Sequence, residues 1–245
     1  MEKTFKVSKL IADAGICSRR NAEKLVREGK VKLNNKTLGN VAERATIRDN
    51  IQIDNKKINL IKKKVGLWKY YKPIGKLTTN YDPLGRKTIF DELPKNLPRL
   101  ITIGRLDFNS EGLLLMTNSG SLARYLELPK NSFIREYKVK IEGDINIQKL
   151  KNLERGITIK GIKYKSIKVN LLEKKGGFFS IKMKLKEGKN REIRKIIGFF
   201  GWKVNKLKRI TYGPIKIGSL KINQIKEINI NKYFKKNYEN NRWQV

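Results

Sequence analysis

Every second residue is apolar along two stretches in the C-terminal two-thirds of the chain, 136–142 and 178–185. A two-residue period predicts β-strands that bury one face and expose the other. In the first stretch, the predicted buried face carries Tyr137, Val139 and Ile141. Shorter apolar runs predict further strands at 67–71, 100–103 and 113–117.

A helical period follows in 190–200, where isoleucines recur on one face and Gly201 ends the run. A second, shorter helix is expected at 121–126. Together with the strands, these helices make the C-terminal region a mixed α+β structure.

The N-terminal region begins with two short helical patterns, each preceded by a serine. We expect Ser8 to cap a helix over 9–14 and Ser18 to cap a helix over 19–28, since a serine hydroxyl accepts hydrogen bonds from free N–H groups. Short strands and a turn are expected after them, at 31–33, 34–35 and 51–53.

These patterns predict an α+β protein with two domains. A basic run, Lys62-Lys63-Lys64, separates them. The expected division is a first domain over 1–61, a linker over 62–66, a second domain over 67–235 and a polar tail over 236–245.

Positive charge is spread over both regions. The chain of 245 residues has 57 Lys and Arg against 22 Asp and Glu, a net charge of +35. Of these, residues 1–62 hold 15 basic and 7 acidic side chains. Such an excess predicts a polyanionic partner, RNA or DNA, for both regions. A membrane surface is the competing partner, but no apolar run is long enough to span a bilayer and no secretory pattern precedes the first helix. We therefore expect a cytoplasmic protein.

The chain contains no histidine and one cysteine, Cys17. Histidine-based catalysis, histidine metal sites and an internal disulfide are thereby excluded. Cys17 is expected to be a packing residue. Any catalysis must use Asp, Glu, Tyr, Lys or Arg, and no metal site is predicted.

The helix after Ser18 carries Arg19, Arg20 and Lys24. They are either a solvated basic face or, with the helix N-terminus, a phosphate-binding surface. The segment from Ala14-Gly15-Ile16-Cys17-Ser18-Arg19-Arg20 to Gly29-Lys30-Val31 resembles the S4 RNA-binding domain. The resemblance implies that these three cations contact structured RNA.

Asp107 follows an apolar run and precedes another, within Gly104-Arg105-Leu106-Asp107 and Gly112-Leu113-Leu114-Leu115-Met116-Thr117-Asn118. A loop aspartate commonly bonds its own turn. The combined signature, however, resembles that of RNA pseudouridine synthases, the branch that modifies ribosomal RNA and carries an S4-like domain. The resemblance implies that Asp107 is the catalytic carboxylate and that Arg105 helps to displace the target base.

Two later segments extend this resemblance. The segment Arg135-Glu136-Tyr137-Lys138-Val139 resembles a strand segment of the family. The resemblance implies that Tyr137, which would otherwise be a core aromatic, assists proton abstraction. In Asn190-Arg191-Glu192-Ile193-Arg194-Lys195, Arg194 matches the arginine that pairs with the catalytic aspartate. Arg191 and Lys195 are expected to share its helix face and to bind RNA, the alternative being a solvated basic face. Lys206-Leu207-Lys208-Arg209 matches a closing strand, with Leu207 as an apolar wall for the base.

The resemblance implies a mainly antiparallel catalytic sheet with flanking helices and a cofactor-free isomerisation of uridine to pseudouridine. Asp107 is implied to attack ribose C1′ or assist base detachment there, with attack on C6 of the base as the alternative. The loop around Arg86, an expected RNA contact, resembles most the group acting on large-subunit rRNA. The chain is expected to be a monomer. A catalytically idle RNA-binding or ribosome-assembly factor is the competing function.

Departures from the family pattern are few. Ser119 stands where an acidic residue is frequent, Ser110 where threonine is frequent, and Glu192 where glutamine is common. None of them removes an implied catalytic residue.

Overall fold

The computed structural model describes residues 2–60 and 64–239, with side chains as far as Phe234. It divides into two compact units at Val65 and Gly66. The first unit also includes Asn96–Leu100 and Asn118–Gly120, which the sequence pattern had assigned to the second domain. Lys62 and Lys63 of the predicted linker lie outside the described residues.

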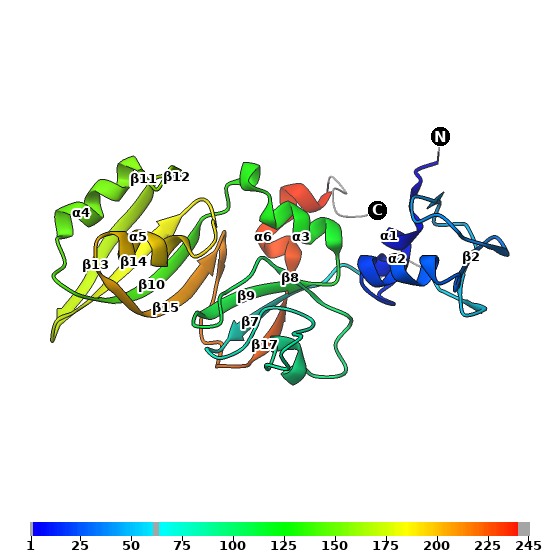
Figure 1. Ribbon diagram of the computed structural model, residues 1–245, viewed down its shortest axis with the longest axis horizontal. Coiled ribbons are helices and arrows are strands. Elements are labelled where there is room, and N and C mark those ends of the chain that lie inside the picture. The colour runs from blue at the N-terminus through cyan, green and yellow to red at the C-terminus, as the bar shows by residue number, and fades with distance from the viewer. Residues whose placement is uncertain (1, 61–63, 240–245) are drawn as a thin grey trace. The chain divides into compact units, whose positions relative to one another are not determined.

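The first unit, at the blue end of the ribbon in Figure 1, packs two helices with short strands. The helices are α1 (Val7–Asp13) and α2 (Arg19–Arg27). A four-stranded antiparallel sheet has the order β3-β2-β5-β6, and β1 pairs with β4. The strands are β1 (Phe5–Lys6), β2 (Val31–Leu33), β3 (Lys36–Thr37), β4 (Arg44–Ala45), β5 (Ile51–Ile53) and β6 (Lys56–Lys57).

The two serines of the first unit differ in their roles. Ser18 caps α2, since its side chain accepts a hydrogen bond from the Asn21 N–H at 3.1 Å. Ser8 is not a cap. It lies inside α1 and is buried, and Lys6 precedes that helix without a side-chain capping bond. The helix starts earlier than predicted because Val7 is itself a core residue, 1% exposed.

Within the described residues, the second unit is built on a nine-stranded sheet with the main order β13-β14-β10-β15-β9-β7-β17. β8 pairs with β9, and β16 pairs with β15. All neighbours are antiparallel except β15 and β9. The strands are β7 (Leu67–Lys72), β8 (Ile101–Ile103), β9 (Glu111–Thr117), β10 (Arg135–Glu142), β13 (Ile167–Lys175), β14 (Phe178–Leu185), β15 (Lys203–Tyr212), β16 (Ile215–Lys216) and β17 (Ile225–Ile228).

The parallel contact joins the two halves of this sheet through Gly112 and Arg209. Gly112 has φ +104°, and a Cβ atom there would lie 2.3 Å from the Arg209 carbonyl oxygen. A glycine is therefore required for β9 to approach β15. This contact brings the start of β9, next to Asp107, against the middle of β15.

Helices and a hairpin complete the second unit (Figure 1). Ile193, Ile196 and Ile197 of α5 pack with sheet residues such as Val139 and Ile181 in one hydrophobic cluster. The elements are α3 (Gly120–Glu127), α4 (Ile147–Asn152), α5 (Glu192–Phe199), α6 (Ile230–Glu239), and the hairpin of β11 (Ile157–Ile159) and β12 (Ile162–Tyr164).

α6 contains residues 236–239 of the predicted polar tail, and residues 240–245 lie outside the described part of the chain. In the two described ranges, no helix combines the length and the apolar character needed to cross a membrane.

Candidate active site

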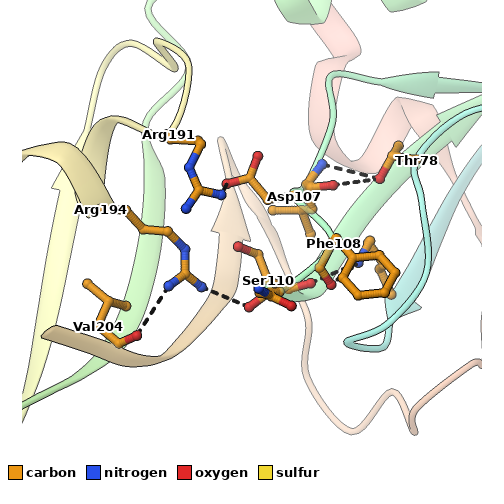
Figure 2. A network of polar contacts seen from close by, with 10 residues as sticks. Thr78, Asp107, Phe108, Ser110, Arg191, Arg194 and Val204 are labelled. Atoms are coloured by element: carbon orange, nitrogen blue, oxygen red, sulfur yellow. Dashed lines mark hydrogen bonds and ion pairs between the residues drawn. The ribbon is translucent and has the colours of Figure 1, made fainter.

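Asp107 lies in the loop between β8 and β9, and main-chain contacts fix this loop. Thr78 Oγ1 donates to the Leu106 carbonyl at 2.8 Å, and the Ser110 N–H donates to the Asp107 carbonyl at 3.0 Å. The turn is thus closed by the backbone, and no loop N–H within the described residues donates to the Asp107 carboxylate. The carboxylate instead faces Arg191 (Figure 2).

A buried lysine, Lys72, also holds this loop through hydrogen bonds to backbone carbonyls. Lys72, at the end of β7, is 0% exposed and donates from Nζ to the carbonyls of Pro73 at 2.8 Å and Ser110 at 2.9 Å, with Phe108 at 3.5 Å. Burial lowers the pKa of Lys72 to about 8, while the charges of Asp107 and Glu111 oppose this shift. Lys72 therefore anchors the loop that presents Asp107.

Arg191, and not Arg194, forms the ion pair with Asp107. The Arg191 Nη1 and Asp107 Oδ2 atoms are 3.7 Å apart, whereas Arg194 makes no ion pair with that carboxylate. The pairing with Arg194 that the resemblance implied is not found in this structure, in which the helix starts at Glu192. Arg191 precedes it in the left-handed conformation, with φ 50° and ψ 34°, so its side chain does not share the face of Arg194.

Arg194 contacts the backbone on both sides of the site (Figure 2). Its Nη2 donates to the Asn109 carbonyl at 2.8 Å and its Nη1 to the Val204 carbonyl at 3.2 Å. Burial lowers the pKa of Arg194, with the nearby Arg191 adding to this effect and Asp107 opposing it. The planar guanidinium thereby ties the Asp107 loop to β15.

Asp107 lines a cavity of about 220 Å³ whose opposite wall is formed by β10 and β15. Tyr137 on β10 is directly opposite Arg209 on β15, and Leu207 lies two residues before Arg209 on the same strand face. The residues that line this cavity include Arg105, Asp107, Tyr137, Arg191, Glu192 and Leu207.

Two arginines of this wall contact Tyr212. Arg209 is 2% exposed, donates from Nε to the Leu113 carbonyl at 2.7 Å, and has its Cζ 5.3 Å from the Tyr212 ring centre. Arg135 donates from Nη2 to the Tyr212 hydroxyl at 2.9 Å. The tyrosine hydroxyl in turn donates to the Leu126 carbonyl at 2.9 Å. These contacts fix positive charge at the wall of the cavity.

Two family models match the chain. The model described as RNA pseudouridylate synthase covers residues 66–197, and the S4 domain model covers residues 6–51. The chain belongs to the RNA pseudouridylate synthase family. An uncharacterised RNA pseudouridine synthase of Rickettsia typhi is 48% identical, over 97% of this chain and 100% of the relative.

Two further proteins extend the comparison. The protein called ribosomal large subunit pseudouridine synthase B in Bacillus subtilis is 36% identical, over 91% of both chains. A crystal structure of a pseudouridylate synthase matches 93% of this chain and 97% of its own, with a TM-score of 0.66 and 22% identity, and so shares the fold. The α+β fold with an N-terminal S4 domain is thereby confirmed.

The structure of this pseudouridine synthase brings five of the sequence-predicted residues to one cavity: Arg105, Asp107, Tyr137, Arg191 and Leu207. Arg194 contacts the loop from outside the cavity lining, and Lys195 is exposed on α5. Among the described residues, no group of three or more Cys, Asp or Glu is placed to hold a metal ion.

The other predicted RNA contacts lie on exposed surfaces. Arg19, Arg20 and Lys24 are exposed on α2 of the S4 unit, and Lys24 is within 3.7 Å of Glu28. Arg86 forms an ion pair with Asp82, with Nη2 2.7 Å from Oδ1. Since Asp82 accepts from both the side chain and the N–H of Arg86, this pair closes the loop on itself.

Sequence patterns missed Lys72 and the Arg135, Arg209 and Tyr212 group of this synthase. Lys72 ended a predicted strand next to Pro73 and showed no chemical signal, because the carbonyl of Ser110 that it contacts lies 38 residues away.

Proposed function

We propose that this pseudouridine synthase isomerises a specific uridine of large-subunit ribosomal RNA. The observation that carries the proposal is the cavity that Asp107, Tyr137 and Leu207 line together, with Arg191 paired to Asp107. The large-subunit assignment rests on relatives that bear that name in Bacillus subtilis and Vibrio cholerae, the latter 38% identical over 86% of this chain. The proposed setting is a cytoplasmic monomer acting on rRNA or on an assembly intermediate.

The target uridine leaves its stack and enters the cavity, at a cost of a few kcal/mol. Arg105, exposed at the cavity edge, occupies the space that the base vacates, and Leu207 packs against the base. The exposed cations Arg19, Arg20, Lys24, Arg86, Arg191 and Lys195 contact the RNA backbone.

Asp107 attacks ribose C1′, and the bond from C1′ to N1 of uracil breaks with its electron pair moving to the base. The trapped uracil rotates and C5 bonds to C1′, which releases the carboxylate. Tyr137 assists loss of the C5 proton, and N1 gains a proton. Substrate and product have the same atoms, so no donor or acceptor from outside is needed. Arg191 orients Asp107 for the attack through their ion pair.

The test is to incubate the wild-type protein and Asp107→Asn with unmodified large-subunit rRNA and map pseudouridine at nucleotide resolution. We expect one new site with the wild type and a loss of at least about 10³-fold with the variant. RNA affinity, measured by filter binding, should be unchanged or slightly higher, because a negative charge has been removed. Turnover by the variant contradicts the role of Asp107. Tight binding without product on any RNA favours the idle assembly factor.

A further inference from the structure

A second carboxyl side chain in the cavity wall, Glu192, closes the turn that carries Arg191. Glu192 begins α5 and is 4% exposed. Its Oε2 accepts a hydrogen bond from the Lys189 N–H at 3.0 Å, and its own N–H donates to the Lys189 carbonyl at 3.2 Å. This reciprocal pair encloses Asn190 and Arg191, so Glu192 fixes the left-handed turn from which Arg191 faces Asp107.

The other carboxyl oxygen of Glu192 lacks a donor. Oε1 is buried and has no hydrogen-bond donor among the described residues. Within hydrogen-bonding reach lies the carboxylate of Glu187. Glu187 is itself satisfied as an anion, accepting from the Lys165 N–H at 2.7 Å and from Lys189 Nζ at 3.3 Å. An ionised Glu192 would therefore place a buried, unpaired oxygen against a second negative charge, which is costly.

A proton on the Glu192 carboxyl resolves both problems, because the neutral group can donate a hydrogen bond to Glu187. We propose that Glu192 is a positioning residue that works as a neutral carboxylic acid, donating a hydrogen bond to Glu187 and so holding Arg191 toward Asp107. The catalytic consequence rests on the proposed function, while the protonation state of Glu192 does not.

The charged groups around Glu192 agree with this assignment. The pKa of Glu192 is raised to about 7, mainly by burial; the neighbouring Glu187 contributes to this shift, and Lys189 opposes it. Although burial alone raises the pKa of Glu187, hydrogen bonds from Lys165 and Lys189 lower it. From β10, Arg135 reaches this turn beside Gly188. As the pH rises through 7, Glu192 ionises next to Glu187, and the hydrogen bond that neutral Glu192 donates to Glu187 is lost.

Glu192→Gln tests the proposal, because its amide keeps a carbonyl acceptor and an N–H donor group and does not titrate. We would measure pseudouridine formation by both proteins from pH 6 to pH 8.5. The wild-type rate should fall roughly 30-fold relative to that of Glu192→Gln across this range, as one group of pKa near 7 ionises. Glu192→Leu, which lacks the donor, should be slow at every pH. Glu136→Gln is the matched control: Glu136 pairs with Lys184 at 2.8 Å outside the cavity, so it should keep the wild-type profile.

Two measurements without RNA decide the protonation state independently. A ¹³C-carboxyl NMR resonance that titrates near pH 7 and is missing from Glu192→Gln is the expected result. Because the folded-state pKa exceeds that of the unfolded chain, stability from this group is complete below about pH 4.5 and is lost as the pH rises toward 7. The wild-type melting temperature should thus fall more over this range than that of Glu192→Gln.

A Glu192 resonance that titrates at an ordinary glutamate pKa overturns the proposal, as do parallel rate profiles for wild type and Glu192→Gln. Absence of product from the wild type on every RNA would instead contradict the proposed function. The NMR titration and the melting curves still decide on Glu192 in that case.

Discussion

The two units of this synthase place their charged side chains in opposite ways. In the first unit, the core cluster is aliphatic, and the predicted RNA-binding cations of α2 are exposed. Among the described residues, every buried charged side chain lies in the second unit. These residues are Lys72, Lys76, Glu111, Glu192 and Arg209.

This difference corresponds to two uses of charged side chains, the binding of RNA and the positioning of the catalytic site. An exposed cation loses little hydration and adapts to a polyanion of variable shape, so its position need not be fixed. A buried charge is costly unless surrounding groups satisfy it, and those groups then fix where it lies. In the second unit, buried or half-buried cations hold three successive carbonyls, those of Phe108, Asn109 and Ser110. The Asp107 loop is thus held in place by cations that are buried or half-buried within this unit.

The sharpest test of this comparison is Lys72→Met, which removes a buried charge at nearly constant length. The carbonyls of Pro73 and Ser110 lose their donor, so the Asp107 loop should shift. Turnover should fall on the order of 100-fold, as expected for a misplaced catalytic group, while RNA affinity stays within two-fold. Single-turnover rates and filter binding measure the two effects separately.

Lys69→Met is the matched control, because Lys69 lies on the same strand and is half-buried. Its Nζ donates to the Ile217 carbonyl at 3.2 Å, away from the loop. Equal losses of turnover in both variants would show that any lysine of β7 matters only for stability.

Neighbouring residues of α5 give a second comparison, of intermediate effect. Arg194→Gln removes the guanidinium that bridges the Asn109 and Val204 carbonyls, and Lys195→Gln removes an exposed charge one residue later. We expect turnover to fall roughly 30-fold with the first variant and less than two-fold with the second. Similar effects in steady-state assays would mean that both residues act only by binding RNA.

The sequence predicted elements wherever local periodicity was strong. The strand over 178–185 was predicted with the bounds that β14 has, and Ser18 caps α2 as expected. β13 was not predicted, because it is an edge strand whose second half is exposed and charged, so its pattern lacks a buried face. Local pattern carries no signal where packing does not distinguish the two faces.

The site was predicted as a set of residues but not as a set of contacts. Asp107, Tyr137 and Leu207 line one cavity, as their motifs implied. The resemblance implied Arg194 as the partner of Asp107, whereas Arg191 forms the ion pair in the structure. A single residue in the left-handed conformation, Arg191, changed that assignment. That turn is held by a local contact between Lys189 and Glu192, which the helical pattern expected over 190–200 did not include.

The smallest expected effect concerns the exposed cations of the first unit. In Arg19→Gln/Arg20→Gln, two charges leave the first turn of α2, where the helix dipole disfavours them, so the fold should not be weakened. Affinity for large-subunit rRNA should fall about ten-fold, with the salt dependence reduced by roughly one to two counterions. The rate of saturated enzyme should not change. Lys56→Gln/Lys57→Gln removes the same charge from β6, also exposed in this unit. If it weakens binding equally, the first unit acts through net charge; if only the α2 variant does, α2 is the RNA-binding surface.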